Sequence, residues 1–258
     1  MGGVSFDFYI DTDSWLHRAD PRTKMLLVVC LVTLLLLSKN LFFIMAMLAA
    51  IHLLLFSAHV PAGKLIWVWK LMLPVMIMIA FFWPLFYREG RLLLAFWIIR
   101  ITSGALITGA AMALRITALG FAFFILLFTT GQTQLVRGME KIGLPYKAGL
   151  IFSLTLRFLP TIFGMIQMVI DAQKARGLNL RSGSWFRRLR ALQPILVAVI
   201  ITGLRTSDNL ARALETRGFG REGRKRTFYH DLRFRLTDSA CSVAIIVGTV
   251  AILVCGLY

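Results

Sequence analysis

Asp171-Ala-Gln-Lys-Ala-Arg-Gly177 and Ala211-Arg-Ala-Leu-Glu-Thr-Arg-Gly218 end two long apolar helical patterns within the stretch from Pro145 to Gly220. Both endings are Arg-Gly, and the two pairs lie 41 residues apart. Glycine can close a helix in the left-handed conformation, and an arginine beside it can cover the last carbonyls or reach outward to a partner's carboxylates. One such ending is usually an ordinary helix cap, but two in one apolar chain indicate a duplicated contact.

A proline precedes each ending inside the same apolar pattern. Pro160 lies 16 residues before Arg176, and Pro194 lies 23 residues before Arg217. The two spacings differ by seven residues, which is close to two helical turns. Each half is therefore predicted to be an apolar helix kinked at a proline, with a basic last turn and a glycine stop.

The composition places the whole chain in a membrane. Of its 258 residues 58% are hydrophobic and only 16% are charged, and the mean hydropathy is +0.76. These values lie outside the range of soluble domains, so we predict an all-α integral membrane protein. The segment from Met1 to Lys24 is too polar and acidic for a secretory signal peptide, so the first span is expected to be retained.

The positive charge is concentrated in one region. The net charge is +17, and residues 131–235 hold 19 Lys and Arg against six Asp and Glu, or +13 of that total. In a membrane protein such a block is first a sign of topology, because cytoplasmic loops carry the excess of Lys and Arg. We predict that this region lies in the cytoplasm and does not bind nucleic acid.

Five segments are predicted to cross the membrane, which puts the N-terminus in the cytoplasm and the C-terminus outside. We expect three regions: N-terminal transmembrane helices over 1–130, a cytoplasmic coupling-helix region with both Arg-Gly motifs over 131–235, and a C-terminal transmembrane helix over 236–258. The spans are Met25–Ser38, with its start near Arg22, then Leu41–Ala58, Leu65–Tyr87, Ser103–Thr130 and Leu236–Leu257.

Two stretches do not follow this pattern directly. Residues 88–100 are too short and too charged at their ends to span, so we expect them to lie in the interface or to re-enter. Residues 148–170 are long enough to span, but Arg157, Pro160 and basic flanks favour a helix that stays on the cytoplasmic side. The second coupling segment has about 14 apolar residues, too few to cross.

Local patterns name further candidate residues. Asp20 suits an N-cap and Pro21 the first position of a helix, with Arg22 beside the membrane. Ala105, Gly109 and Ala113 form a stripe of small residues that allows close helix packing; packing within the chain is favoured over a docking face for a partner. Arg115 interrupts a span and needs an internal partner or a wet cavity.

The sequence contains no motif of an enzyme. The phosphate-binding loop of ATPases, the metalloprotease motif and the Cys-x-x-Cys motif are all absent. The three cysteines are widely separated and each lies inside an apolar run, and His52 and His59 are more consistent with packing than with a metal site. We therefore expect no cofactor, no metal and no catalytic residue.

Three motifs in this order resemble one protein family. The chain is similar to the T component (EcfT/CbiQ-like), the transmembrane coupling subunit, of energy-coupling factor (ECF) type ABC transporters, over nearly its whole length. The motifs are Tyr9–Lys24 with Leu-His-Arg-Ala-Asp-Pro-Arg-Thr-Lys, Gly143–Gly177 with Arg157-Phe-Leu-Pro160 before Ala-Arg-Gly, and Arg188–Phe219 with Leu-Gln-Pro194 before Thr-Arg-Gly.

The resemblance implies a function and partners. It implies that two coupling helices contact two cytoplasmic ATPase subunits through Ala175-Arg176-Gly177 and Thr216-Arg217-Gly218. A separate substrate-binding membrane subunit would dock on this chain in a prokaryotic cell membrane, for uptake of a vitamin or a cobalt or nickel ion. Asp20, Pro21, Arg22, Arg157, Pro160 and Pro194 match structural or coupling positions of the motifs.

The sequence departs from the family pattern at one place, and the residues leave two alternative functions open. After Pro160 the family usually carries acidic residues, whereas this chain reads Thr161-Ile-Phe-Gly-Met-Ile. That departure bears on which subunit packs there. The alternatives are a stand-alone channel or secondary transporter, favoured by broken helices and the small-residue face, and a membrane enzyme with Arg115, Arg157 and Asp20 in a wet cavity, which lacks an acid/base pair.

Overall fold

The structure is a computed structural model that describes residues 9–10, 12, 14–86, 92–96, 99–177, 185–219 and 236–254. Residues 7–149 and 232–258 form one compact unit, called the bundle below, and residues 150–231 belong to a second, called the two-helix unit. The predicted span that ends at Tyr87 and the basic stretch 221–235 lie partly or wholly outside the described residues.

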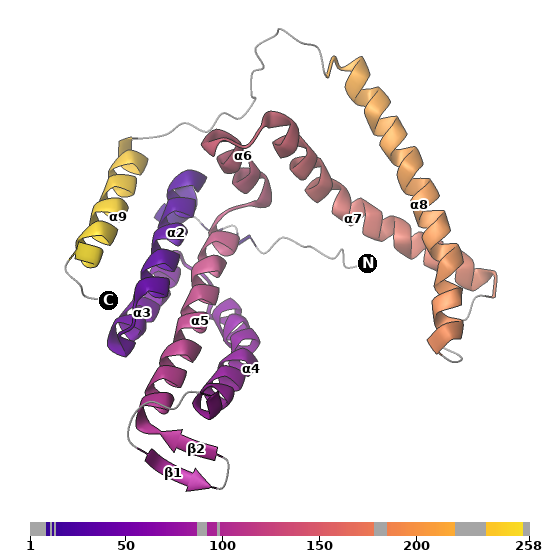
Figure 1. The fold of residues 1–258 in the computed structure, drawn as a ribbon. Coiled ribbons are helices and arrows are strands. Elements are labelled where there is room, and N and C mark those ends of the chain that lie inside the picture. The colour runs from indigo at the N-terminus through magenta and orange to yellow at the C-terminus, as the bar shows by residue number, and fades with distance from the viewer. Residues whose placement is uncertain are drawn as a thin grey trace. The chain divides into compact units, whose positions relative to one another are not determined.

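The bundle contains the segments that the sequence predicted to cross the membrane, together with one pair of antiparallel strands (Figure 1). Its elements are α1 (Trp15–Arg18), α2 (Pro21–Leu37), α3 (Leu41–Ser57), α4 (Ala62–Phe86), β1 (Leu92–Phe96), β2 (Ile99–Thr102), α5 (Ser103–Thr129), α6 (Gln132–Ile142), the first turn of α7 (Tyr146–Ala175) and α9 (Leu236–Val254). The two-helix unit contains the rest of α7 and α8 (Trp185–Thr216).

The start of α2 follows from its sequence as predicted. Asp20 is the N-cap, and its Oδ1 accepts a hydrogen bond of 2.9 Å from the backbone N–H of Arg22. Pro21 occupies the first turn, where a missing N–H has no consequence for the helix. At the other end a short turn leads into α3, where the Asn40 side chain accepts from Phe42 N–H.

The bundle core lies where α3, α4 and α5 meet. Ile44, Ile51, Phe121 and Ile125 are fully buried there. His52 also packs in this core: its Nε2 accepts from Trp69 Nε1 at 3.1 Å, and its Nδ1 lies 2.9 Å from the Leu48 carbonyl. This pair of contacts fits the neutral Nδ1–H tautomer, so His52 is a packing residue, as expected.

Residues 92–96 and 99–102 form two antiparallel strands, within the stretch for which the sequence predicted an interfacial or re-entrant location but no secondary structure. Leu94 pairs with Ile101 and Phe96 with Ile99, with an irregularity between Leu92 and Leu94. Aliphatic, aromatic and β-branched side chains favour an extended backbone here. Because two paired strands need only about five residues each, the segment does not require the length of a helix.

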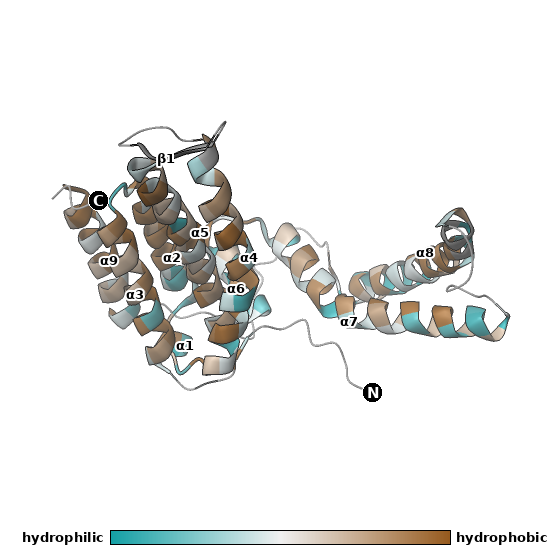
Figure 2. Ribbon diagram, turned by 90° about the horizontal axis from the view of Figure 1, so that it is seen from below, coloured by the Kyte–Doolittle hydropathy of each residue, from teal (hydrophilic) through white to brown (hydrophobic). Residues whose placement is uncertain are grey.

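The predicted fold class is confirmed: the chain is an all-α membrane protein, with these two strands as the β-structure of its described part. Figure 2 shows apolar residues along most of α2, α3, α4, α5 and α9. Four helical segments are long and apolar enough to cross a membrane, while α3 is a shorter apolar helix. The four are Ala62–Pro84, Ser103–Thr129, Tyr146–Ala175 and Leu236–Val254. Length and composition therefore do not distinguish α7 from the helices that are predicted to span the membrane.

Candidate functional site: two arginine-tipped helix ends

The first Arg-Gly ending closes α7 with a left-handed glycine. Gly177 has φ +87° and its N–H donates to the Lys174 carbonyl at 2.9 Å. Arg176 is the residue before it, and its N–H still donates to Ala172 and Gln173. This geometry is the predicted glycine cap, in which the residue after the last helical turn satisfies a free carbonyl.

The second ending closes α8 in the same way. Gly218 has φ +74° and its N–H donates to the Glu215 carbonyl at 2.8 Å, while Phe219 N–H donates to Leu214 at 2.9 Å. These two bonds are the pair that defines a Schellman cap. The Thr216 hydroxyl adds a bond of 3.0 Å to the Ala213 carbonyl. The last turn is therefore held by both backbone and side chain.

Both arginines and their neighbours are exposed within the unit that carries them. Ala175, Arg176, Thr216 and Arg217 are all exposed. The Asp171 carboxylate forms an ion pair with Lys174, whose Nζ lies 3.3 Å from Oδ1. In the described ranges neither arginine contacts a carboxylate. Two guanidinium groups of matched setting are thus open to a partner's acidic side chains.

The prolines and Arg157 lie within the same two helices. Pro160 is inside α7 and Pro194 is inside α8, and each removes one backbone hydrogen bond of its helix. Arg157, Pro160 and Pro194 are all exposed. A mostly apolar groove of about 350 Å³ lies between the two helices and is lined by Phe158, Ile162, Met165 and Leu210, among others. Within the two-helix unit itself, apolar surface is therefore left uncovered.

A polar cluster in the bundle holds the first turn of α2. The Lys24 Nζ donates to the Thr129 carbonyl at 2.7 Å and to the His17 carbonyl at 3.1 Å. Asp238, at the start of α9, accepts from the Asp20 N–H at 3.3 Å. Arg22 Nε lies 3.9 Å from Asp20 Oδ1. Asp20, Lys24 and Asp238 are 5%, 1% and 7% exposed.

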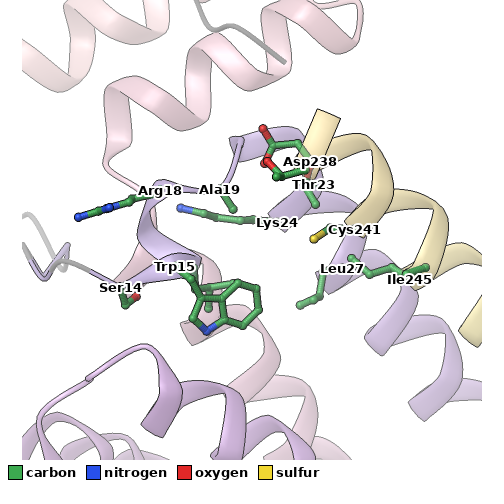
Figure 3. A pocket seen from close by; sticks show the side chains of 13 residues that line it. Ser14, Trp15, Arg18, Ala19, Thr23, Lys24, Leu27, Asp238, Cys241 and Ile245 are labelled. Carbon is green, nitrogen blue, oxygen red and sulfur yellow. The ribbon is translucent and has the colours of Figure 1, made fainter. Parts of the chain in front are cut away.

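Figure 3 shows this cluster from the cavity beside it, with Lys24, Thr23 and Asp238 at the polar end and Leu27, Cys241 and Ile245 along the apolar wall. The cavity has a volume of about 590 Å³. Asp20, Pro21 and Arg22 were predicted from the sequence as structural or coupling positions, whereas Lys24 and Asp238 were not. Asp238 follows Asp20 by 218 residues, so no local pattern could pair them.

The small-residue stripe is inside the bundle. Ala105 and Ala113 are 0% and 2% exposed. A Cβ on Gly109 would lie 3.3 Å from Cδ of Pro84 in α4, so α4 already occupies this face. Arg115 has the internal partner that the sequence required: its guanidinium donates to the carbonyl of Ser38, which ends α2.

The described part of the chain brings together no group of three His, Cys, Asp or Glu side chains that could hold a metal. Its distinctive features are a bundle of apolar helices and two long helices with matched arginine ends. Together these define a multi-pass membrane protein.

Comparison with known proteins agrees with this class. A family model described as "Cobalt transport protein" matches residues 12–228. The chain is 32% identical to the energy-coupling factor transporter transmembrane protein EcfT of Listeria innocua, over 93% of each chain. It is 31% identical to the protein of the same description from Brevibacillus brevis, over 98% of each chain. The chain belongs to this family of ECF transporter transmembrane proteins.

Proposed function

We propose that this chain is the coupling subunit of an ECF-type importer, in which α7 and α8 transmit the movement of two cytoplasmic ATPase subunits to a substrate-binding membrane subunit. The observation that carries the proposal is the pair of glycine-capped helix ends, each with an exposed arginine before a left-handed glycine. Two equivalent contacts fit two ATPase subunits. The cargo would be a vitamin or a cobalt or nickel ion, selected by the substrate-binding subunit.

The cap gives each arginine a defined place from which to bind. A helix end closed by backbone hydrogen bonds does not fray, so the guanidinium leaves a rigid support. Its planar fork of donors can bind a carboxylate through two parallel hydrogen bonds, which a lysine cannot do. Because both ends of such a contact are fixed, a displacement of the ATPase subunit would displace the helix with it.

The uncovered apolar faces support a membrane partner on the same unit. The α7–α8 groove and the exposed Phe152, Phe163, Leu196 and Ile200 need lipid or another protein to cover them. We infer that α7 lies along the cytoplasmic side, because Arg157 and Pro160 in its middle are costly in lipid. The substrate-binding subunit would then rest on these faces.

The orientation of the bundle fits the same arrangement. The bonds from Lys24 to Thr129 and from Asp238 to Asp20 place the start of α2, the end of α5 and the start of α9 at one level. In the sequence the basic region 131–235 connects the end of α5 to the start of α9, and its charge favours the cytoplasm. We propose that the N-terminus is cytoplasmic as well.

The test is substitution of Arg176 and Arg217 by alanine, singly and together, in the complex with both ATPases and the substrate-binding subunit. Loss of one partner of a desolvated Arg-carboxylate pair costs about 2 to 5 kcal/mol, so each single variant should loosen one ATPase. Lysine should restore little, since it lacks the fork geometry.

Arg205→Ala is the matched control, because Arg205 is an exposed arginine in the body of α8. Its complex should keep both ATPases. The proposal fails if the double alanine variant co-purifies with both ATPases and transports normally. Uptake by the isolated chain without ATPases would favour a stand-alone transporter.

A further inference from the structure

The chain leaves the bundle for the two-helix unit after residue 149 and returns to it at residue 232. The helices on either side of this excursion, α5 and α9, both contact the first turn of α2. On the outgoing side, Thr129 at the end of α5 accepts from Lys24. On the returning side, α9 begins at Leu236, and its Asp238 accepts from the N–H of Asp20. Two residues of one turn thus bind the end of α5 and the start of α9.

α6 extends this contact toward the start of α7. Gly138 of α6 faces Pro21 so closely that a Cβ there would lie 3.0 Å from the proline Cβ. Two residues further on, Glu140 lies against Gly149, where a Cβ would collide with the glutamate side chain. A continuous set of close contacts therefore runs from the first turn of α7 through α6 to α2.

The charged groups of the polar cluster add to this set of contacts. The Lys24 ammonium lies near the carboxylates of Asp20 and Asp238, and all three residues are shielded from solvent. Removing one member of such a buried set leaves an unpaired charge, which is far more costly than removing an exposed ion pair. Thr23 and Ser242 add a second tie between α2 and α9, with their hydroxyl oxygens 3.3 Å apart.

We propose that Lys24 and Asp238 are positioning residues for coupling, which clamp the end of α5 and the start of α9 to the first turn of α2 so that a movement of α7, whose first turn belongs to the bundle, is passed on to these helices. The inference rests on the proposed function and deepens it. It assigns to Lys24 and Asp238 a role in transmission, distinct from the ATPase contact assigned to Arg176 and Arg217.

The experiment measures substrate uptake per ATP hydrolysed in proteoliposomes that contain the full complex. We expect Lys24→Met and Asp238→Asn to lower this ratio about fivefold, while both ATPases still co-purify. Lys70→Met is the matched control, an exposed lysine of an apolar helix, and should keep the wild-type ratio. The double variant with Lys24→Met and Asp238→Asn removes both charges. It replaces the single variants in the test if one of them misfolds.

A crosslink between α2 and α9 tests whether the charged residues act by holding these helices together or are needed for their charge alone. In a background with Cys30→Ser, Cys241→Ser and Cys255→Ser, cysteines in place of Thr23 and Ser242 are close enough to form a disulfide. This disulfide should restore the ratio of Asp238→Asn, and a reductant should abolish the rescue.

The proposal is overturned if the charge variants stay within about twofold of the wild-type ratio, or if the formed disulfide gives no rescue. Loss of the ATPases from these variants would also overturn it, since the cluster would then serve assembly. Failure of the ATPase contact itself would show separately, in the Arg176 and Arg217 variants.

Discussion

Single residues set the geometry of the two helix ends. Gly177 and Gly218 have positive φ values, a conformation that side chains disfavour, and each follows the arginine that we assign to an ATPase contact. The sequence predicted both caps, because Arg-Gly after a long apolar pattern has a local physical cause. It could not predict that the Lys24 ammonium is buried, because the acceptor of its shortest bond lies 105 residues away.

Gly177→Ala should destabilise the end of α7 by about 1 kcal/mol, since an alanine there must adopt the left-handed conformation. No atom lies within 4 Å of the added Cβ, so the cost is one of conformation alone. Hydrogen exchange of the last-turn amides should become about fivefold faster. Gly164→Ala in the same helix is the control, because its surroundings are equally open and its backbone is helical. Equal exchange rates in the two variants would contradict the prediction.

Arg115→Met should lower the thermal stability of the bundle. The Arg115 guanidinium donates to the Ser38 carbonyl at the end of α2, and a hydrogen bond to a charged group contributes about 1.5 to 3 kcal/mol. Tryptophan fluorescence of the detergent-solubilised protein should show an earlier unfolding transition. Lys70→Met should leave the transition in place, because Lys70 is exposed. A transition equal to wild type in Arg115→Met would show that this contact does not stabilise the bundle.

At the scale of elements, close helix packing organises the bundle, and α4 and α5 are its clearest case. Gly109 and Gly120 of α5 face Pro84 and Met72 of α4 at distances that leave no room for a side chain without a shift. The spacing of small residues predicted a close-packed face, and the structure places α4 on it. The pairing of β1 with β2 was not predicted, since a short apolar stretch fits a strand, an interfacial helix or a re-entrant loop equally well.

Gly109→Leu should separate α4 from α5 and destabilise the bundle by about 1 to 3 kcal/mol, the usual cost of overpacking. The reason is the contact with Pro84, whose ring cannot rotate away. Gly248→Leu in α9 introduces the same side chain where no atom lies within 4 Å, so it should be tolerated. Thermal unfolding in detergent compares the two variants. Equal loss in both would show that added bulk, and not the α4 contact, is responsible.

For the whole molecule, composition and charge were enough to predict an all-α membrane protein with a basic region between its helices. The pairing of distant segments was beyond them. Asp238 carries no sign in the sequence that it accepts from Asp20, and nothing local indicates that the last helix begins beside the first turn of α2. These contacts depend on tertiary packing, which brings together residues without a shared pattern.

The proposed topology predicts which positions a membrane-impermeant maleimide reaches in intact cells. In a cysteine-free background, Lys39→Cys in the α2–α3 turn should be labelled from outside. Ala62→Cys at the start of α4 and Thr133→Cys in α6 should be labelled only after permeabilisation. All three positions are exposed, so accessibility within the chain does not limit the reaction. The reverse labelling pattern would place the arginine ends on the outer side and rule out the ATPase contact.

The buried Lys24 cluster also bears on how the protein is made. Lys24 emerges from the ribosome long before Thr129, and Asp20 long before Asp238. Until those later segments are synthesised, an ammonium group at the head of the first apolar helix has none of its distant partners. The bundle therefore reaches its final arrangement only when the last helix has inserted, and a chain that stops before residue 236 lacks the carboxylate that completes it.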